Sequence, residues 1–341
     1  MSLAKQSANE GSAKQVFAKQ GFVHRPWAPL VLGVGIIVGG TILGIILGTV
    51  SDFGFTRMSL ILITTVLLLG LGVVTGTAGM IALCQLSFAA AGAYIVEWMS
   101  LHHVASFLGG SAFIFYMICG AAFAMVMGII VGLPALRLRG VNLAVVTLSL
   151  SFVFDVTIVT LGFPGTKTNE FIDRPFGIGG SPEDKDTMWV ALFALIITAI
   201  VAVAVVYLQR SRLGSSWKMV AFSERGTASS GTNVRFAKLT AFAVSAGVGG
   251  IAGGLFEALY RQGNPTLFGP YSSLVLYVLS AIVGSYLIDM AFFGGVLSVV
   301  IPFILTRLSW PMFIGDMLFG VLGIQALTTG SNLGEIGRAH V

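Results

Sequence analysis

Long apolar runs separated by short polar segments dominate this sequence. Several runs hold about twenty residues, which is the length that an α-helix needs to cross a bilayer. Lipid offers the backbone no hydrogen-bond partners, so the pattern predicts helices and an all-α polytopic membrane protein. We expect a bundle of about ten transmembrane helices, at residues 27–50, 58–75, 76–97, 107–133, 141–161, 187–208, 239–260, 272–288, 290–306 and 310–327.

Two of these segments are interrupted and could be broken or re-entrant. Residues 76–97 read GTAGMIALCQLSFAAAGAYIVE, in which polar and small residues break the apolar pattern. Transporters place irregular backbone at such points because there it can line a cavity. Residues 141–161 carry several hydroxyl side chains and Asp155 in an apolar stretch. An ionisable group at membrane depth usually faces a pathway or a partner, although Asp155 could also reach water at the outer end of its helix.

Composition agrees with a chain embedded in a membrane, because 56% of the residues are hydrophobic and only 10% are charged. The formal net charge of +5 lies mostly in segments predicted to face the cytoplasm. It therefore orients the chain, with both termini cytoplasmic, and does not indicate nucleic-acid binding. Residues 1–26 form a polar, basic arm without the apolar core of a signal peptide, and residues 329–341 form a short polar tail.

Patterns typical of catalysis or metal binding are absent from the sequence. It contains no Gly–Lys pair, hence no Walker A phosphate-binding loop, and neither an HExxH helix nor a nucleophile elbow. Cys84 and Cys119 lie inside apolar runs, which argues against a disulfide framework or a thiol metal site. His102 and His103 have no third ligand nearby, so we expect them at a membrane interface. We expect no enzymatic activity, no metal and no cofactor.

A polar island rich in Lys and Arg, residues 209–238, stands between two long apolar runs. Short loops with this charge stay on the cytoplasmic side of a membrane. The island could serve only to fix the topology, but it also has an internal pattern of small, aromatic and polar residues. The positions that define this pattern are Gly214, Trp217, Glu224, Gly231 and Asn233.

The order of these five residues resembles the EAA-type cytoplasmic loop of ABC importer permeases, in their branched-chain amino acid (LivM-like) branch. In that family the loop docks into a groove on the ATPase subunit. One departure is that Gly226 and Thr227 replace the small helix-forming residues expected after the glutamate. Because Gly is a poorer helix former than Ala by about 1 kcal/mol, the resemblance implies a shorter docking helix here. Gly231 is expected to end that helix in a left-handed conformation.

Three further segments resemble the same family. Residues 76–94 share its interrupted motif, with Ala82 and Cys84 in place of a serine and a glycine. Residues 134–148, PALRLRGVNLAVVTL, match another motif of the family closely. The third segment, within residues 239–255, is rich in glycine. Small residues four positions apart let helix backbones approach closely, and the segment has two such pairs, Gly249/Gly253 and Gly250/Gly254.

The resemblance implies an importer permease domain at residues 27–328 with a coupling loop at 209–238. It implies a transport subunit of the cell inner membrane, whose partners are ATPase subunits, a homologous second permease and an external solute-binding protein. The implied substrates are branched-chain amino acids, although urea and short-chain amide permeases share these motifs. Candidates for hydrogen-bonding groups along the pathway are Gln85, Ser87, Thr147, Ser149 and Asp155.

An ion-coupled secondary transporter is the alternative from a different class. In such a protein buried acids would carry the coupling ion, with Glu97, Asp155 and Glu257 as candidates. All three lie toward the predicted outer ends of their helices. Uptake that requires an active ATPase would support the importer, and uptake driven by an ion gradient would support the alternative.

Overall fold

The computed structural model describes residues 35, 39, 54–135, 138, 141–165, 171–172, 175, 184–284, 288–309, 311 and 313–329. The predicted arm at 1–26, nearly all of the predicted span at 27–50 and the tail after residue 329 lie outside these residues. Every regular element in the described part of the chain is a helix, as predicted. The α-helices are α3 (Gly54–Leu71), α4 (Gln85–Leu101), α5 (Ala112–Ala135), α6 (Val141–Leu161), α8 (Asp184–Arg210), α9 (Arg212–Phe222), α10 (Glu224–Ser229), α11 (Val234–Tyr260), α12 (Pro270–Val283), α13 (Ile288–Arg307) and α14 (Phe313–Thr329).

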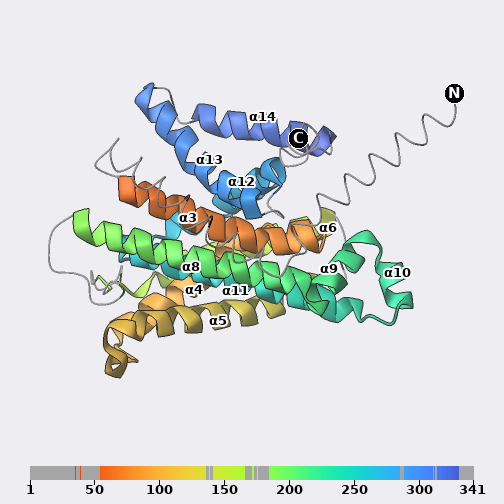
Figure 1. The fold of residues 1–341 in the computed structure, drawn as a ribbon, viewed down its shortest axis with the longest axis horizontal. Coiled ribbons are helices and arrows are strands. Elements are labelled where there is room, and N and C mark those ends of the chain that lie inside the picture. The colour runs from red at the N-terminus through yellow and green to blue at the C-terminus, as the bar shows by residue number, and fades with distance from the viewer. Residues whose placement is uncertain are drawn as a thin grey trace.

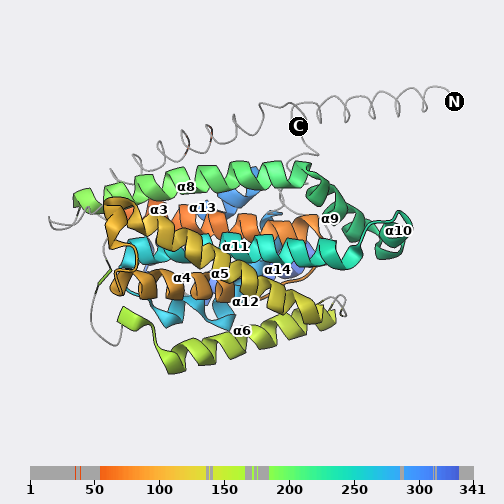
Figure 2. The same ribbon diagram turned by 90° about the horizontal axis from the view of Figure 1, so that it is seen from below.

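The long helices run roughly side by side around α11, which packs mainly on α5, α4 and α3 (Figures 1 and 2). Helix α8 covers one edge of the bundle beside α3, and α6 lies along the opposite edge (Figure 2). Helices α12, α13 and α14 form a further group (Figure 1). Helix α13 packs on α3, and α12 contacts α4 and α6 as well as α3. The short helices α9 and α10 project from one end of the bundle, where α8 ends and α11 begins.

Six helical segments of the described residues are long and apolar enough to cross a membrane. Of the ten predicted spans, the one at 27–50 lies almost entirely outside the described residues, and three others correspond to shorter helices. Helices α4 and α14 have 17 residues each, and α12 has 14. At 1.5 Å per residue such helices fall short of a hydrocarbon core of about 30 Å. The six segments are Gly54–Thr77, Gly109–Pro134, Asn142–Leu161, Thr187–Arg210, Val234–Tyr260 and Met290–Arg307.

The glycines of α11 set how closely the helices of the core approach one another. A Cβ placed on Gly250 would lie 2.7 Å from the Cβ of Ala124 on α5, and one placed on Gly253 would overlap the carbonyl oxygen of Ala89 on α4. The backbones of α4 and α5 therefore contact α11 directly, which is the role expected of the predicted small-residue pairs.

The predicted interruption at residues 76–97 is a true break in the helix. Helix α3 continues as a π-helical turn, η1 (Gly72–Thr77), and the chain then runs without helix from residue 78 to residue 84 before α4 begins at Gln85. The second interrupted segment differs, because α6 is a continuous helix over the predicted residues Val141–Leu161. Asp155 and the hydroxyl side chains of that segment therefore do not mark a break.

Candidate functional site

The polar island folds into two short helices joined at Ser223. The backbone of Ser223 is extended (φ −161°, ψ 114°), which ends α9, and its hydroxyl accepts a hydrogen bond of 3.2 Å from the N–H of Gly226. This hydroxyl therefore caps the N-terminus of α10, satisfying a backbone donor that has no partner within the helix. Helix α10 has six residues, and Gly231 follows it with a φ of 79°. The predicted left-handed glycine is confirmed.

Three of the pattern residues hold this unit on the bundle. Trp217 of α9 is fully buried, and its indole N–H donates a 3.0 Å hydrogen bond to the hydroxyl of Thr240 on α11. Gly214 lies where a Cβ would overlap the backbone of Gln209 at the end of α8. The side-chain oxygen of Asn233 accepts a 3.2 Å hydrogen bond from the N–H of Phe236, so it caps the N-terminus of α11.

Glu224 forms an ion pair with Lys238 that ties α10 to α11. The carboxylate Oε1 lies 2.8 Å from Nζ of Lys238, whose side chain is only 5% exposed, whereas that of Glu224 is 23% exposed. Lys238 was predicted as part of the loop, but α11 begins at Val234, which places the lysine inside the helix. The carboxylate of Glu224 thus points back toward the bundle.

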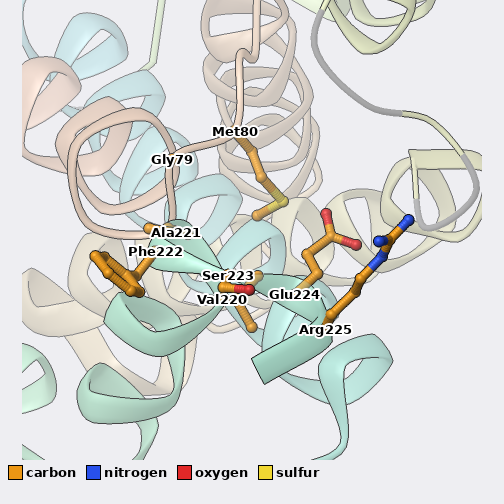
Figure 3. A pocket seen from close by; sticks show the side chains of 9 residues that line it. Gly79, Met80, Val220, Ala221, Phe222, Ser223, Glu224 and Arg225 are labelled. Atoms are coloured by element: carbon orange, nitrogen blue, oxygen red, sulfur yellow. The ribbon is translucent and has the colours of Figure 1, made fainter. Parts of the chain in front are cut away.

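A cavity of about 330 Å³ lies where helices α9 and α10 meet residues 78–84. We name these residues, the non-helical stretch between η1 and α4, the broken segment. The lining of the cavity consists of residues 78–80 and 220–225, and Figure 3 shows Met80 extending toward Ser223 between Phe222 on one side and Glu224 on the other. Gly79 has a φ of 66°, and a Cβ there would lie 3.1 Å from the Cβ of Ala221. The broken segment and α9 are therefore in direct contact.

The other end of the broken segment is held by buried polar side chains from two helices, α6 and α12. The N–H of Leu83 donates a 3.1 Å hydrogen bond to the hydroxyl of Thr147 on α6, and the N–H of Leu86 donates a 3.2 Å hydrogen bond to Ser273 on α12. These side chains satisfy backbone donors that the helix break leaves free, which is a requirement at membrane depth.

Gln85 and Ser87 extend this polar network. Gln85 exchanges two hydrogen bonds with Ser245 of α11, because its amide donates to the serine carbonyl (3.2 Å) and its Oε1 accepts from the serine hydroxyl (2.9 Å). The Ser87 hydroxyl donates to that of Ser151 on α6 over 3.0 Å. We name the set the buried polar network; its side chains are at most 1% exposed and comprise Gln85, Ser87, Thr147, Ser151, Ser245 and Ser273.

The structure thus brings together three of the five predicted pathway residues: Gln85, Ser87 and Thr147. Ser149 is exposed on α6 and its hydroxyl donates to the carbonyl of Val145 in its own helix, and Asp155 is half-buried nearer the C-terminal end of α6. The prediction omitted Ser151, Ser245 and Ser273. The first was visible as a hydroxyl residue of the interrupted segment and the second as a residue of the glycine-rich span.

Among the described residues no group of three or more His, Cys, Asp or Glu is placed to hold a metal ion. The cysteine thiols of Cys84 and Cys119 are free, and the first is buried.

Comparisons with known proteins agree on one family. A model of the family described as "Branched-chain amino acid transport system / permease component" matches residues 53–327. The permease protein LivM of the high-affinity branched-chain amino acid transport system of Escherichia coli (strain K12) is 30% identical over 229 residues, which cover 60% of this chain and 52% of that protein. LivM of Salmonella typhimurium (strain LT2) is 29% identical over 229 residues, covering 59% of this chain and 51% of its own length. The chain thus spans about half the length of these relatives. No solved structure matches.

Proposed function

The chain belongs to the branched-chain amino acid permease family, and we propose that it is the membrane-spanning subunit of an ATP-driven importer for branched-chain amino acids. The two similar LivM proteins, named for that transport, support the choice of substrate. Since the sequence has no Walker A loop, the proposal assigns ATP hydrolysis to partner subunits. We further propose that the chain lies in the inner membrane with both termini cytoplasmic. Its proposed partners besides the ATPases are a homologous second permease and an external solute-binding protein.

Helices α9 and α10 are the proposed docking surface for an ATPase subunit, and they carry the proposal. The five-residue pattern of the family loop folds here into a unit that projects from the bundle yet is fixed to it by Trp217 and Glu224. Phe222 of this unit is 95% exposed beside the 330 Å³ cavity, and Arg225 is exposed next to it. Aromatic and arginine side chains beside a pocket are the typical anchors of protein interfaces.

The buried polar network is the proposed part of the translocation pathway that such docking would control. It supplies hydroxyl and amide groups that could exchange their mutual hydrogen bonds for those of a small zwitterion. The broken segment contacts α9 at Gly79 and the network at Leu83. Docking can drive transport only if these contacts have at least two conformations and the ATPase binds them with different affinities.

Reconstituted uptake tests the proposal. The chain is placed in liposomes with its ATPases, second permease and binding protein, with ATP on the ATPase side, and labelled leucine, valine, urea and acetamide are offered in turn. Leucine and valine uptake that requires ATP and stops with a hydrolysis-deficient ATPase is the expected result. Selective uptake of urea or acetamide would replace the substrate assignment. Uptake that persists without ATP on a proton or sodium gradient would overturn the importer in favour of a secondary transporter.

A further inference from the structure

Two buried glutamates lie on neighbouring helices at the end of the bundle opposite α9 and α10. Glu97 lies near the C-terminus of α4 and Glu257 near the C-terminus of α11, and their side chains are buried, at 0% and 1% exposure. The helices that carry them pack along each other. A Cβ on Gly253 would lie 2.8 Å from the backbone N of Ala93, and one on Gly254 would lie 3.5 Å from Cγ2 of Val96. Glu257 and Glu97 follow one turn further along the two helices, so they come at the same level of this contact.

Each carboxyl group has one oxygen without a partner. Glu97 Oε1 accepts a 3.0 Å hydrogen bond from the backbone N–H of Gly263. By contrast, Oε2 of Glu97 and Oε2 of Glu257 are buried and have no hydrogen-bond partner among the described residues. Both orphan atoms are acceptors when the acids are ionised, so neither could satisfy the other.

The two described cations nearby make contacts of their own. The Arg261 side chain, at the end of α11, donates a 3.1 Å hydrogen bond from Nε to the carbonyl of Ile172. Arg57, on α3, lies over the ring of Phe303, 4.0 Å from its centroid. The other described ionisable side chains at this end of the elements packed around the pair are Tyr94 of α4, His102 and His103 directly after it, Tyr116 of α5, Asp155 of α6, Tyr260 of α11 and Tyr271 of α12.

We propose that Glu97 and Glu257 form a proton-binding dyad, in which one proton is shared between the two Oε2 atoms. Protonation of one carboxyl turns its oxygen into a donor that the other carboxylate accepts, so both orphan atoms gain a partner and the repulsion of two buried charges is removed. A divalent cation would require more oxygen ligands than the pair supplies. The described residues provide no third acidic, His or Cys ligand.

The dyad is placed to control the outer loops of the bundle. Glu97 accepts the hydrogen bond from the N–H of Gly263, while neighbouring Gln262 donates a 3.1 Å hydrogen bond to the carbonyl of Gly165. Both bonds connect the loop after α11 to α4 and to the loop after α6. Loss of the shared proton would set two like charges against each other beneath these bonds. The hydrogen bonds of Gly263 and Gln262 should therefore persist at low and neutral pH and weaken as the pH rises.

Infrared spectroscopy of the full chain in lipid bilayers tests the dyad. Difference spectra between neutral and strongly alkaline pH report protonated carboxyl groups through their C=O stretch. The wild-type chain should lose the amplitude of one buried carboxyl on alkalinisation, and both Glu97→Gln and Glu257→Gln should abolish that signal. Asp155→Asn, which removes a carboxyl on a neighbouring helix, should leave it intact. The glutamine variants keep the size of the side chain and can still donate to the remaining carboxylate, so the fold should persist.

No signal in the wild-type chain, a signal with the amplitude of two carboxyls, or a signal that survives both glutamine substitutions would overturn the dyad. A second measurement is the thermal midpoint as a function of pH, which should fall with rising pH in the wild-type chain and lose that dependence in Glu257→Gln. An equal dependence in both proteins would also count against it. Neither measurement requires transport, so failure of the importer assignment leaves this test unaffected.

Discussion

Removal of the Glu224 carboxylate should release α10 from the bundle. In Glu224→Ala the ammonium group of Lys238, 5% exposed, loses its ion-pair partner. Exposed ion pairs contribute about 0–1 kcal/mol, whereas breaking a buried pair costs about 3–5 kcal/mol. With Glu224 at 23% exposure the pair lies between these limits. We expect a loss of about 2 kcal/mol in the attachment of α10, or roughly thirtyfold in its opening equilibrium.

Amide hydrogen exchange measures this opening directly. Exchange in α10 and in the turn at Gly231 should accelerate by roughly thirtyfold in Glu224→Ala, because local unfolding governs the exchange of such segments. The amides of α5 in the core should be unaffected. Arg225→Ala is the matched control, because this neighbouring side chain is exposed, and its effect should stay within about 0.5 kcal/mol. Substrate-stimulated ATP hydrolysis in the assembled complex should also fall in Glu224→Ala. Arg225 is itself a proposed ATPase contact, so Arg225→Ala is the control for the exchange measurement alone.

The double variant Glu224→Ala/Lys238→Met decides whether the buried charge is the cause. With methionine at position 238 no unpaired ammonium group remains, so much of the lost attachment should return. Slow exchange in α10 of Glu224→Ala would refute the reasoning. A double variant that opens by the sum of the two single effects would refute it as well, since residues in direct contact are expected to couple by at least about 0.5 kcal/mol.

Three further outcomes are expected. Gln85→Leu should lower the rate of uptake or change its selectivity at unchanged membrane abundance, and uptake identical to wild type would remove Gln85 from the pathway. Gly253→Ala should lower the thermal midpoint because its Cβ would overlap α4, whereas Gly320→Ala should not, since a Cβ at Gly320 meets no atom within 4 Å. In intact cells an impermeant thiol reagent should label a cysteine at Lys185 but not one at Arg225, and the reverse labelling would invert the proposed topology.

The bounds of a helix could be predicted where residues adjacent in the sequence mark its ends. Helix α6 has the predicted bounds, and Gly162, with a φ of 70°, directly follows its last residue. Helix α12 was predicted to continue to residue 288 but ends at Val283, before Gly284 in the left-handed conformation. The apolar run does not reveal that ending, because apolar residues such as Leu287 and Ile288 follow the glycine as well.

The predicted site was incomplete because its partners are distant in the sequence. The hydrogen bonds from Leu83 to Thr147 and from Leu86 to Ser273 join residues 64 and 187 positions apart. No local pattern reveals such pairs, so the sequence indicated an interruption without locating where α4 begins. Lys238 was assigned to a charged loop for a similar reason. Its burial depends on the Asn233 cap, which starts α11 before the lysine.

These contacts give a physical reason for the helix break between η1 and α4. A continuous helix would satisfy its own backbone donors and would need nothing from α6 or α12. The break instead transfers the N–H groups of Leu83 and Leu86 to side chains of those helices, while Gly79 rests on α9. A displacement of α9 therefore acts on a part of the chain whose backbone hydrogen bonds reach two other helices of the bundle, α6 and α12. A regular helix at this position would instead have kept its backbone hydrogen bonds to itself.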